Sequence, residues 1–298
     1  MTTPHLALSE SIAAVVEAAG AAVVRIEGRG GAPLSGTVFP DGVVVTADHA
    51  LDHDGPISIG LADGSTVPAE IAGRDEAIDL AVLKPGATIP GPGIWAETDA
   101  LRVGHLALSL ARPGRTVRAS LGILGAIGEA WTTYAGGRVD RYVQSDGATP
   151  RGFSGGPLVD LSGRFLGMNT AALVRGASIT LPASTLRRAV GDILSTGRPE
   201  RGFLGVSCQR VPLPDPVAAS LRQPSGLLVF GVQPRSPAAE AGLLLGDVLV
   251  GLDGEPVARM GDLLGLLGAR RAGTKASVRI LRAGRLEEAS VALGARSC

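Results

Sequence analysis

Hydrophobic residues between positions 22 and 181 fall in short runs that Gly, Pro and Asp interrupt. The runs include "GTVF", "GVVVTA", "ISIGL", "DLAVLK", "HLALSLA", "RYVQS", "GPLVD" and "SITLP". Short β-branched and aliphatic runs at this close spacing, with no helical pattern between them, are typical of strands. The pattern predicts an all-β barrel or sandwich.

Helical periodicity flanks this region on both sides. The stretch "SIAAVVEAAGAAVVRI" predicts a short amphipathic helix, capped by Ser9 or Ser11, that leads into a strand at 22–26. The stretch "PASTLRRAVGDILSTG" predicts a second helix, for which Ser184 is the expected cap and Gly197 the stop signal.

A second unit follows the polar stretch "TGRPERG" at 196–202, which is the predicted linker because it holds both Gly and Pro. Strand patterns at "FLGVSCQ", "GLLVFGV" and "DVLVGLDG" alternate with short helical patterns at "SPAAEAGL" and "GDLLGLLGA". A closing hairpin is expected to turn at Ala283 and Gly284. The sequence therefore predicts two domains, 1–198 and 201–296, the second a small α+β domain.

Composition excludes several classes of protein. Lys and Arg total 28, as do Asp and Glu, so no global charge would attract nucleic acid or an anionic membrane. Cys208 and Cys298 are the only cysteines, which gives no basis for a disulfide framework or a thiolate metal site. No uncharged apolar run approaches about 18 residues, so no membrane span is expected. No Lys or Arg precedes Arg25, so an export signal is missing and a soluble, cytoplasmic protein is expected.

Candidate chemistry begins with "RGFSGGPLVD" at 151–160, where three glycines surround Ser154. The stretch fits an ordinary turn into a strand. It also fits a nucleophile on a tight turn whose backbone N–H groups converge into an oxyanion hole. The pattern Gly-x-Ser-x-Gly occurs in α/β-hydrolases as well, but their histidine follows the serine. All four histidines precede Ser154 here, which leaves the order His, Asp, Ser.

Among the histidines, His49 is the best candidate for a general base. It follows "GVVVTAD", a buried strand whose end would hold the ring rigidly beside a cleft. His5 lies near the terminus, and His53 lies between two aspartates in a pattern typical of a solvated turn. His105 opens an apolar strand, where a histidine at the strand end, or one satisfied within the core, is the simpler interpretation.

The segment "GRDEAIDLAVLK" offers Asp75, Glu76 and Asp79 as the acid. We expect Asp75 and Glu76 to be turn charges on a solvated face. Asp79 begins an apolar strand and is expected to be at least partly buried, so it must accept hydrogen bonds from an imidazole or from backbone amides. The alternative is that Asp79 only caps a helix or strand.

The segments "VVVTADHAL", "DEAIDLAVLK" and "QSDGATPRGFSGGPLVDLSGRFLGMNTA" resemble the three catalytic blocks of trypsin-like serine proteases of the HtrA (DegP/DegS) family. "RGFLGV" and "SPAAEAGLLLGDVLVGLDGEPV" resemble the PDZ domain of that family. The resemblance implies a mainly β protein, a chymotrypsin-like double β-barrel followed by a small α+β PDZ domain. It implies that His49 is the general base, Asp79 its orienting carboxylate and Ser154 the nucleophile.

The same resemblance implies further sites. The oxyanion hole would be formed at Gly152, Phe153 and Ser154, with the N–H groups of Gly152 and Ser154 as donors. The S1 pocket would comprise Ala148, Thr149, Asn169 and Thr170. The peptide site of the PDZ domain would comprise Gly202, Phe203, Leu204, Gly205, Val206 and Leu264. Because no carboxylate stands at the S1 positions, cleavage after small or medium aliphatic residues is expected. Phe153 departs from the family, which usually has Asn there.

The resemblance therefore implies a serine endopeptidase that acts in protein quality control on unfolded or damaged proteins, and whose PDZ domain binds peptide C-termini. A homotrimer is the expected assembly. Neither a metal nor a cofactor is needed for this chemistry. The alternative function is that of a catalytically idle, PDZ-bearing peptide-binding or scaffold protein.

Overall fold

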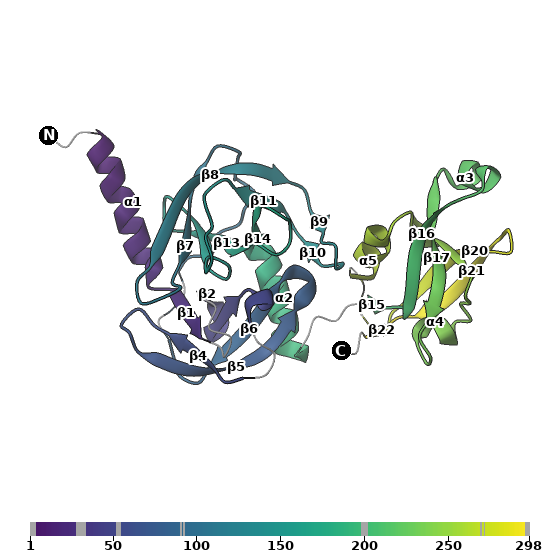
Figure 1. Ribbon diagram of the computed structural model, residues 1–298, viewed down its shortest axis with the longest axis horizontal. Coiled ribbons are helices and arrows are strands. Elements are labelled where there is room, and N and C mark those ends of the chain that lie inside the picture. Colours follow the sequence, from purple (N-terminus) through teal and green to yellow (C-terminus); the bar gives the residue numbers. More distant parts are fainter. Residues whose placement is uncertain are drawn as a thin grey trace. The chain divides into compact units, whose positions relative to one another are not determined.

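The computed structural model describes residues 4–27, 34–51, 55–89, 91, 93–197, 202–268, 270 and 272–295. The chain divides into two compact units, of which the first comprises Met1–Trp131 and Val139–Pro199. The second comprises Thr132–Arg138 and Glu200–Cys298. Figure 1 colours the strands of the first unit from purple to teal and those of the second mostly from green to yellow.

The first half of the first unit is a closed antiparallel barrel with the strand order β1-β2-β3-β6-β5-β4. Its strands are β1 (Val23–Glu27), β2 (Leu34–Phe39), β3 (Val43–Thr46), β4 (Ile57–Gly60), β5 (Thr66–Asp75) and β6 (Leu80–Pro85). The three valines of β3 are buried, as the apolar pattern predicted. Asp41 and Gly42 turn the chain between β2 and β3, both at φ 71°, a region that these residue types tolerate best.

The second half is another closed barrel, with the order β11-β14-β13-β12-β7-β8. Its strands are β7 (Leu106–Ala111), β8 (Arg118–Gly128), β11 (Tyr142–Ser145), β12 (Pro157–Asp160), β13 (Phe165–Thr170) and β14 (Ser178–Pro182). Two short strands, β9 (Trp131–Thr132) and β10 (Arg138–Val139), pair with each other outside this barrel. The two barrels confirm the predicted double-barrel fold (Figure 1).

Helix α1 (Pro4–Gly20) precedes the first barrel and contacts β7. It begins before Ser9 and Ser11, so neither serine is its cap, and the Ser11 hydroxyl instead donates to the C=O of Ala7 at 2.8 Å. The expectation of a serine cap was wrong because the helix extends further toward the N-terminus. Within the described ranges, no helix has the length and apolar character needed to cross a bilayer.

Helix α2 (Ala183–Thr196) closes the first unit by contacting β5, β13 and β14, strands from both barrels. Pro182 occupies its N-cap position without a side-chain hydrogen bond, so the expected cap Ser184 lies inside the helix. Gly197 ends the helix as predicted, at φ 76°, with its N–H donating to the C=O of Ile193 at 2.7 Å.

The second unit is a sheet in the order β16-β17-β18-β20-β21, with β19 paired to β18. Its elements are β15 (Gly202–Phe203), β16 (Val206–Pro212), α3 (Asp215–Leu221), β17 (Ser225–Val232), α4 (Pro237–Glu240), β18 (Val248–Leu252), β19 (Glu255–Pro256), α5 (Met260–Gly268), β20 (Lys275–Arg282), β21 (Arg285–Ala292) and β22 (Gly294–Ala295). Ala283 and Gly284 form the predicted hairpin turn, both with positive φ. That residues 1–198 and 201–296 are separable domains stays a prediction.

Candidate active site

Strand pairing brings His49 and Asp79 to the same end of the first barrel. His49 lies in the short 3-10 turn Asp48–Ala50 that follows β3, and Asp79 ends the turn Glu76–Ile78 just before β6. Strands β3 and β6 are antiparallel neighbours, so the end of one lies beside the start of the other. Asp79 adopts φ 57°, a left-handed conformation that Asp tolerates better than most residues.

The Asp79 carboxylate is buried, and three groups satisfy it. The Nδ1 atom of His49 lies 2.9 Å from Oδ2 and 3.0 Å from Oδ1, and the backbone N–H of His49 donates to Oδ1 at 2.8 Å. The Thr170 hydroxyl donates to Oδ2, while its own oxygen accepts from the N–H of Ala172 at 3.1 Å. A buried charge requires such partners. Asp79 thus fixes the imidazole through Nδ1 and leaves Nε2 for chemistry.

The electrostatic surroundings favour the charged form of His49. The hydrogen bond with Asp79 raises the pKa of His49, partial burial opposes this rise, and the negative charges of Asp79 and Asp48 add to it. Asp48 is itself buried, and Arg74 donates to it at 2.5 Å. Burial raises the pKa of Asp48 despite this ion pair, and the neighbouring charges of Asp79 and Glu76 raise it further. Nothing in the sequence had indicated this buried ion pair beside the candidate base.

Ser154 lies in a tight glycine-rich loop that precedes β12. Gly152 and Gly155 have φ values of 95° and 84°, which side chains rarely allow. The N–H of Phe153 donates to the C=O of Pro150 at 3.1 Å, so Gly152 occupies the third position of a turn that requires positive φ there. The side chain of Phe153 is buried and anchors the loop in the fold.

The N–H groups of this loop fall into two sets. Three of them are used internally: those of Phe153, Gly155 and Gly156, which donate to the C=O groups of Pro150, Asn169 and Phe153 at 3.1, 2.9 and 3.0 Å. The N–H groups of Gly152 and Ser154 make no hydrogen bond with any residue that the structure describes. Two such free donors, one of them on the serine itself, suit the binding of an oxyanion. The N–H of Phe153 is already engaged, so Phe153 contributes to the loop through its packing.

The loop of Ser154 and the carboxylate of Asp79 are both hydrogen-bonded to β13, at adjacent residues. Gly155 donates to the C=O of Asn169, and the next residue, Thr170, donates to Asp79. The Ser154 hydroxyl makes no hydrogen bond with any described residue, so its contact with His49 is not formed in this structure. Catalytic contacts of this kind often tighten only when substrate binds.

The four residues expected at the S1 pocket differ in their surroundings. Ala148 is exposed and Thr149 half-buried in the loop after β11. The Asn169 amide donates to the C=O of Pro157 at 3.1 Å and accepts from the Thr180 hydroxyl at 2.8 Å, so this side chain is committed to the barrel. Sequence reasoning missed the contact of Thr170 with Asp79. The composition of the S1 pocket stays a prediction.

The remaining candidates of the sequence lie elsewhere. His105 is bonded to Arg102, whose backbone N–H and Nε lie 3.4 Å from its two ring nitrogens. His53 and the side chain of His5 lie outside the described residues. Asp75 is buried and accepts from the N–H of Ala77 at 3.2 Å, so the expectation that it faces solvent was wrong, because it caps the turn before Asp79.

In the second unit, the loop between β15 and β16 contains two backbone donors without a partner among the described residues. Gly205 has φ 84°, and the C=O groups of Leu204 and Gly205 accept from Ala238 and Gln233, both at 2.9 Å. The N–H groups of Leu204 and Gly205 make no hydrogen bond within the described ranges. Strand β16 is an edge strand of the sheet and contacts α5. Leu204 is buried, whereas Val206 and Leu264 are half-buried.

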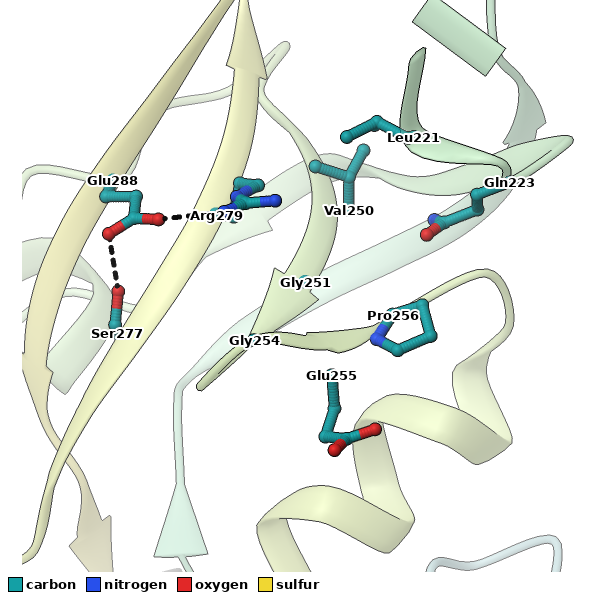
Figure 2. A pocket seen from close by; sticks show the side chains of 10 residues that line it. All are labelled: Leu221, Gln223, Val250, Gly251, Gly254, Glu255, Pro256, Ser277, Arg279 and Glu288. Carbon is teal, nitrogen blue, oxygen red and sulfur yellow. Dashed lines mark hydrogen bonds and ion pairs between the residues drawn. The ribbon is translucent and has the colours of Figure 1, made fainter. Parts of the chain in front are cut away.

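A polar pocket of about 170 Å³ lies on a different part of this unit. Figure 2 shows Arg279 and Ser277 directed at Glu288, which accepts from both at 3.2 Å. Gln223 and Val250 also line it. None of the six residues predicted to bind peptide belongs to this lining.

Comparison with known families matches both units. Residues 34–168 match the trypsin-like peptidase domain, and residues 202–293 match the PDZ domain.

Comparison with curated proteins finds relatives of greater length. A "Probable periplasmic serine endoprotease DegP-like" of Rhizobium meliloti is 34% identical over 282 residues, which are 91% of this chain and 55% of that protein. A protein of the same name from Pseudomonas fulva is 33% identical over 263 residues, 86% of this chain and 54% of that protein. The chain thus spans about half the length of the curated relatives it matches.

These relatives are named periplasmic, which contradicts the cytoplasmic location expected from the sequence. That expectation rested on the absence of a recognisable export signal. Such an absence is no evidence about compartment, so the expectation was wrong.

Solved structures of similar fold cover nearly the whole chain. The HtrA-type protease AlgW with a decapeptide has a TM-score of 0.77 and 25% identity, covering 96% of this chain and 99% of that one. The same protease with a tripeptide has a TM-score of 0.72 and 27% identity, covering 96% and 97%. The chain therefore carries a trypsin-like peptidase domain followed by a PDZ domain, and over nearly its whole length it is similar to HtrA-type proteases.

Proposed function

We propose that this protein is a serine endopeptidase that cleaves unfolded or damaged polypeptides with Ser154, His49 and Asp79. The observation that carries the proposal is the joint arrangement of two features. The buried Asp79 holds His49 through Nδ1 at 2.9 Å, and the backbone N–H groups of Gly152 and of Ser154 itself have no partner among the described residues. The names of the relatives, serine endoproteases, support the same reaction.

In the proposed reaction, Nε2 of His49 takes the proton of Ser154 as its oxygen attacks a peptide carbonyl. The oxyanion of the tetrahedral intermediate accepts hydrogen bonds from the N–H groups of Gly152 and Ser154. His49 then gives the proton to the leaving amine, and water, activated by the same imidazole, hydrolyses the acyl-enzyme. Asp79 holds the imidazole tautomer and stabilises the imidazolium, a role worth about 10⁴-fold in kcat in the trypsin-type template.

The contact between Ser154 and His49 is the one part of the triad that substrate binding must still form. In the structure the Ser154 hydroxyl is not bonded to His49, whereas the acid and the base are already in contact. We propose that an extended substrate in the cleft draws the serine toward Nε2. Because this is the only contact of the triad that forms on substrate binding, the loop of Ser154 is the part of the site that must rearrange.

Specificity is proposed to follow from the residues before the nucleophile. Ala148 and Thr149 bring no charge to the position expected at the floor of the S1 pocket. A Lys or Arg side chain would be buried there without a partner, which is costly, whereas small or medium aliphatic side chains would fit.

The PDZ domain is proposed to capture the C-termini of peptides. The unpaired N–H groups of Leu204 and Gly205 are suited to a terminal carboxylate, and the edge strand β16 can add a peptide strand by β-augmentation. The similar AlgW structures were solved with a decapeptide and a tripeptide, which supports peptide binding. A periplasmic location follows the names of the relatives, and a homotrimer remains part of this proposal.

Hydrolysis of casein by four purified proteins tests the catalytic assignment. The wild type should degrade casein, Ser154→Ala should be inactive, and His49→Ala should be nearly so. His105→Ala is the matched control, because His105 is bonded to Arg102 outside the site, and it should retain most activity. An active Ser154→Ala or an inactive, stable His105→Ala would contradict the assignment. An inactive wild type would favour the scaffold alternative.

A further inference from the structure

Ser35 joins the first barrel to the loop of the nucleophile. It lies on β2, is fully buried, and its hydroxyl donates to the C=O of Gly152 at 2.6 Å across 117 residues of sequence. Its backbone N–H donates to the C=O of Ser154 at 3.3 Å. One residue of the barrel that carries the base thus holds two carbonyl groups of the loop that carries the nucleophile.

We infer that Ser35 is a positioning residue for the oxyanion hole: its hydroxyl fixes the loop so that the N–H groups of Gly152 and Ser154 stay unpaired and aimed at the reacting carbonyl. The inference rests on the proposed peptidase function.

The Ser35 hydroxyl donates its proton to one acceptor among the described residues. A serine hydroxyl has one proton to donate and two positions that accept. The N–H of Arg112 donates to this oxygen at 2.8 Å and thereby occupies an accepting position. Among the described residues, the C=O of Gly152 is the only acceptor bonded to the hydroxyl, so the proton points there. The contact is therefore directional, and no other acceptor among the described residues competes for it.

This contact completes the restraint on the peptide group between Gly152 and Phe153. Its C=O is held by Ser35, and its N–H, which points to the opposite side, is held by the C=O of Pro150 at 3.1 Å. A peptide plane held on both sides resists rotation. Gly152 needs such restraint because glycine populates positive and negative φ about equally. Without the hydroxyl, the turn could rotate and direct its N–H groups away from the oxyanion.

Water does not readily replace the Ser35 hydroxyl. The side chain is fully buried, so Ser35→Ala leaves the C=O of Gly152 and the N–H of Arg112 without a partner. Unpaired buried groups are costly, and the loop can relieve the cost only by moving. A matched control exists in Ser109 on β7, whose hydroxyl is also buried but has no hydrogen-bond partner in the part of the chain that the structure describes.

Kinetics of full-length Ser35→Ala and Ser109→Ala test the inference, with a chromogenic peptide and a fluorophosphonate probe. Removing a direct oxyanion donor costs about 10²- to 10³-fold in kcat, so loss of this indirect support should lower kcat by about tenfold or more. KM should stay unchanged. The probe should label Ser35→Ala more slowly by a similar factor but still reach one label per chain. Ser109→Ala should match the wild type in kcat and labelling rate.

Each outcome bears on the inference. If Ser35→Ala has the kcat of the wild type, the inference is wrong. If the final number of labels per chain falls in proportion to kcat, part of the protein is misfolded, Ser35 serves only folding and the inference is also wrong. Should Ser35→Ala fail to fold, Ser35→Cys keeps a weak donor of similar size. It should then show an intermediate kcat, and wild-type kcat would overturn the inference. A wild type that neither hydrolyses nor labels would refute the proposed function itself.

Discussion

Nδ1 of His49 lies 2.9 Å from Oδ2 of Asp79, and the backbone N–H of His49 donates to the other oxygen of the same carboxylate at 2.8 Å. The acid therefore holds the base at two points, ring and backbone. This double contact fixes both the position of His49 and the orientation of its ring. The imidazole needs no rearrangement before it accepts a proton.

The pH dependence of activity should report the surroundings of His49. Its pKa is raised chiefly by the hydrogen bond with Asp79 and further by the charge of Asp48. A general base works only when neutral, so kcat/KM of the free enzyme should fall as the pH drops through this raised pKa. Asp48→Asn removes a negative charge that favours the imidazolium, so the acid limb should move to lower pH. A pH profile of kcat/KM measures this shift.

The control for that profile is Asp41→Asn, an exposed carboxylate in the turn between β2 and β3. Its acid limb should coincide with that of the wild type. An acid limb that stays in place or moves to higher pH in Asp48→Asn would refute the electrostatic explanation.

Thr170→Val should lower kcat through Asp79. The Thr170 hydroxyl donates to the buried carboxylate, and hydrogen bonds to charged groups contribute about 1.5–3 kcal/mol. If about half of this contribution supports the transition state, kcat should fall by about four- to twelvefold while KM changes little. Thr185→Val is the control, because Thr185 is a buried threonine that contacts another carboxylate, Asp140. Equal kcat values for the two variants would count against the role of Thr170.

Cleavage preference tests the neutral S1 pocket. With Ala148 and Thr149 before the nucleophile, a peptide library should be cut mainly after Ala, Val or Leu. Mass spectrometry of the products gives the residue at P1 directly. Cleavage dominated by Lys or Arg would be incompatible with a pocket that lacks a carboxylate.

Peptide binding tests the PDZ loop. Full-length Ser154→Ala should bind peptides with apolar C-termini and should bind the amidated forms at least about tenfold more weakly, because an amide loses the charge that the N–H groups of Leu204 and Gly205 favour. Calorimetry with matched acid and amide peptides measures the ratio. Equal affinities would leave the carboxylate without a role.

Local pattern predicted much of the fold. Runs of β-branched and aliphatic residues predicted most strands of both barrels, but not β5 or β8. The end of β3 suggested that His49 is held rigidly, and the structure places its ring beside Asp79. The apolar run after Asp79 predicted its burial. These features depend on neighbours in sequence, which is why the residue pattern contains them.

Contacts between distant segments could not be predicted in this way. The bonds of Thr170 to Asp79 and of Ser35 to Gly152 span 91 and 117 residues. These contacts depend on how the strands of the two barrels are placed against each other. The spacing of apolar residues along one strand carries no information about that placement. Asp75 was misjudged for a different, local reason: its charge suggested exposure to solvent, whereas its buried side chain caps the turn two residues further on.

The central claim is that Ser154 is the activated nucleophile, and labelling with a fluorophosphonate followed by peptide mapping tests it most directly. The account predicts one label per chain, on Ser154 alone, absent from Ser154→Ala and retained by His105→Ala. A folded wild-type protein that takes up no label, or carries it on another residue, would contradict the claim.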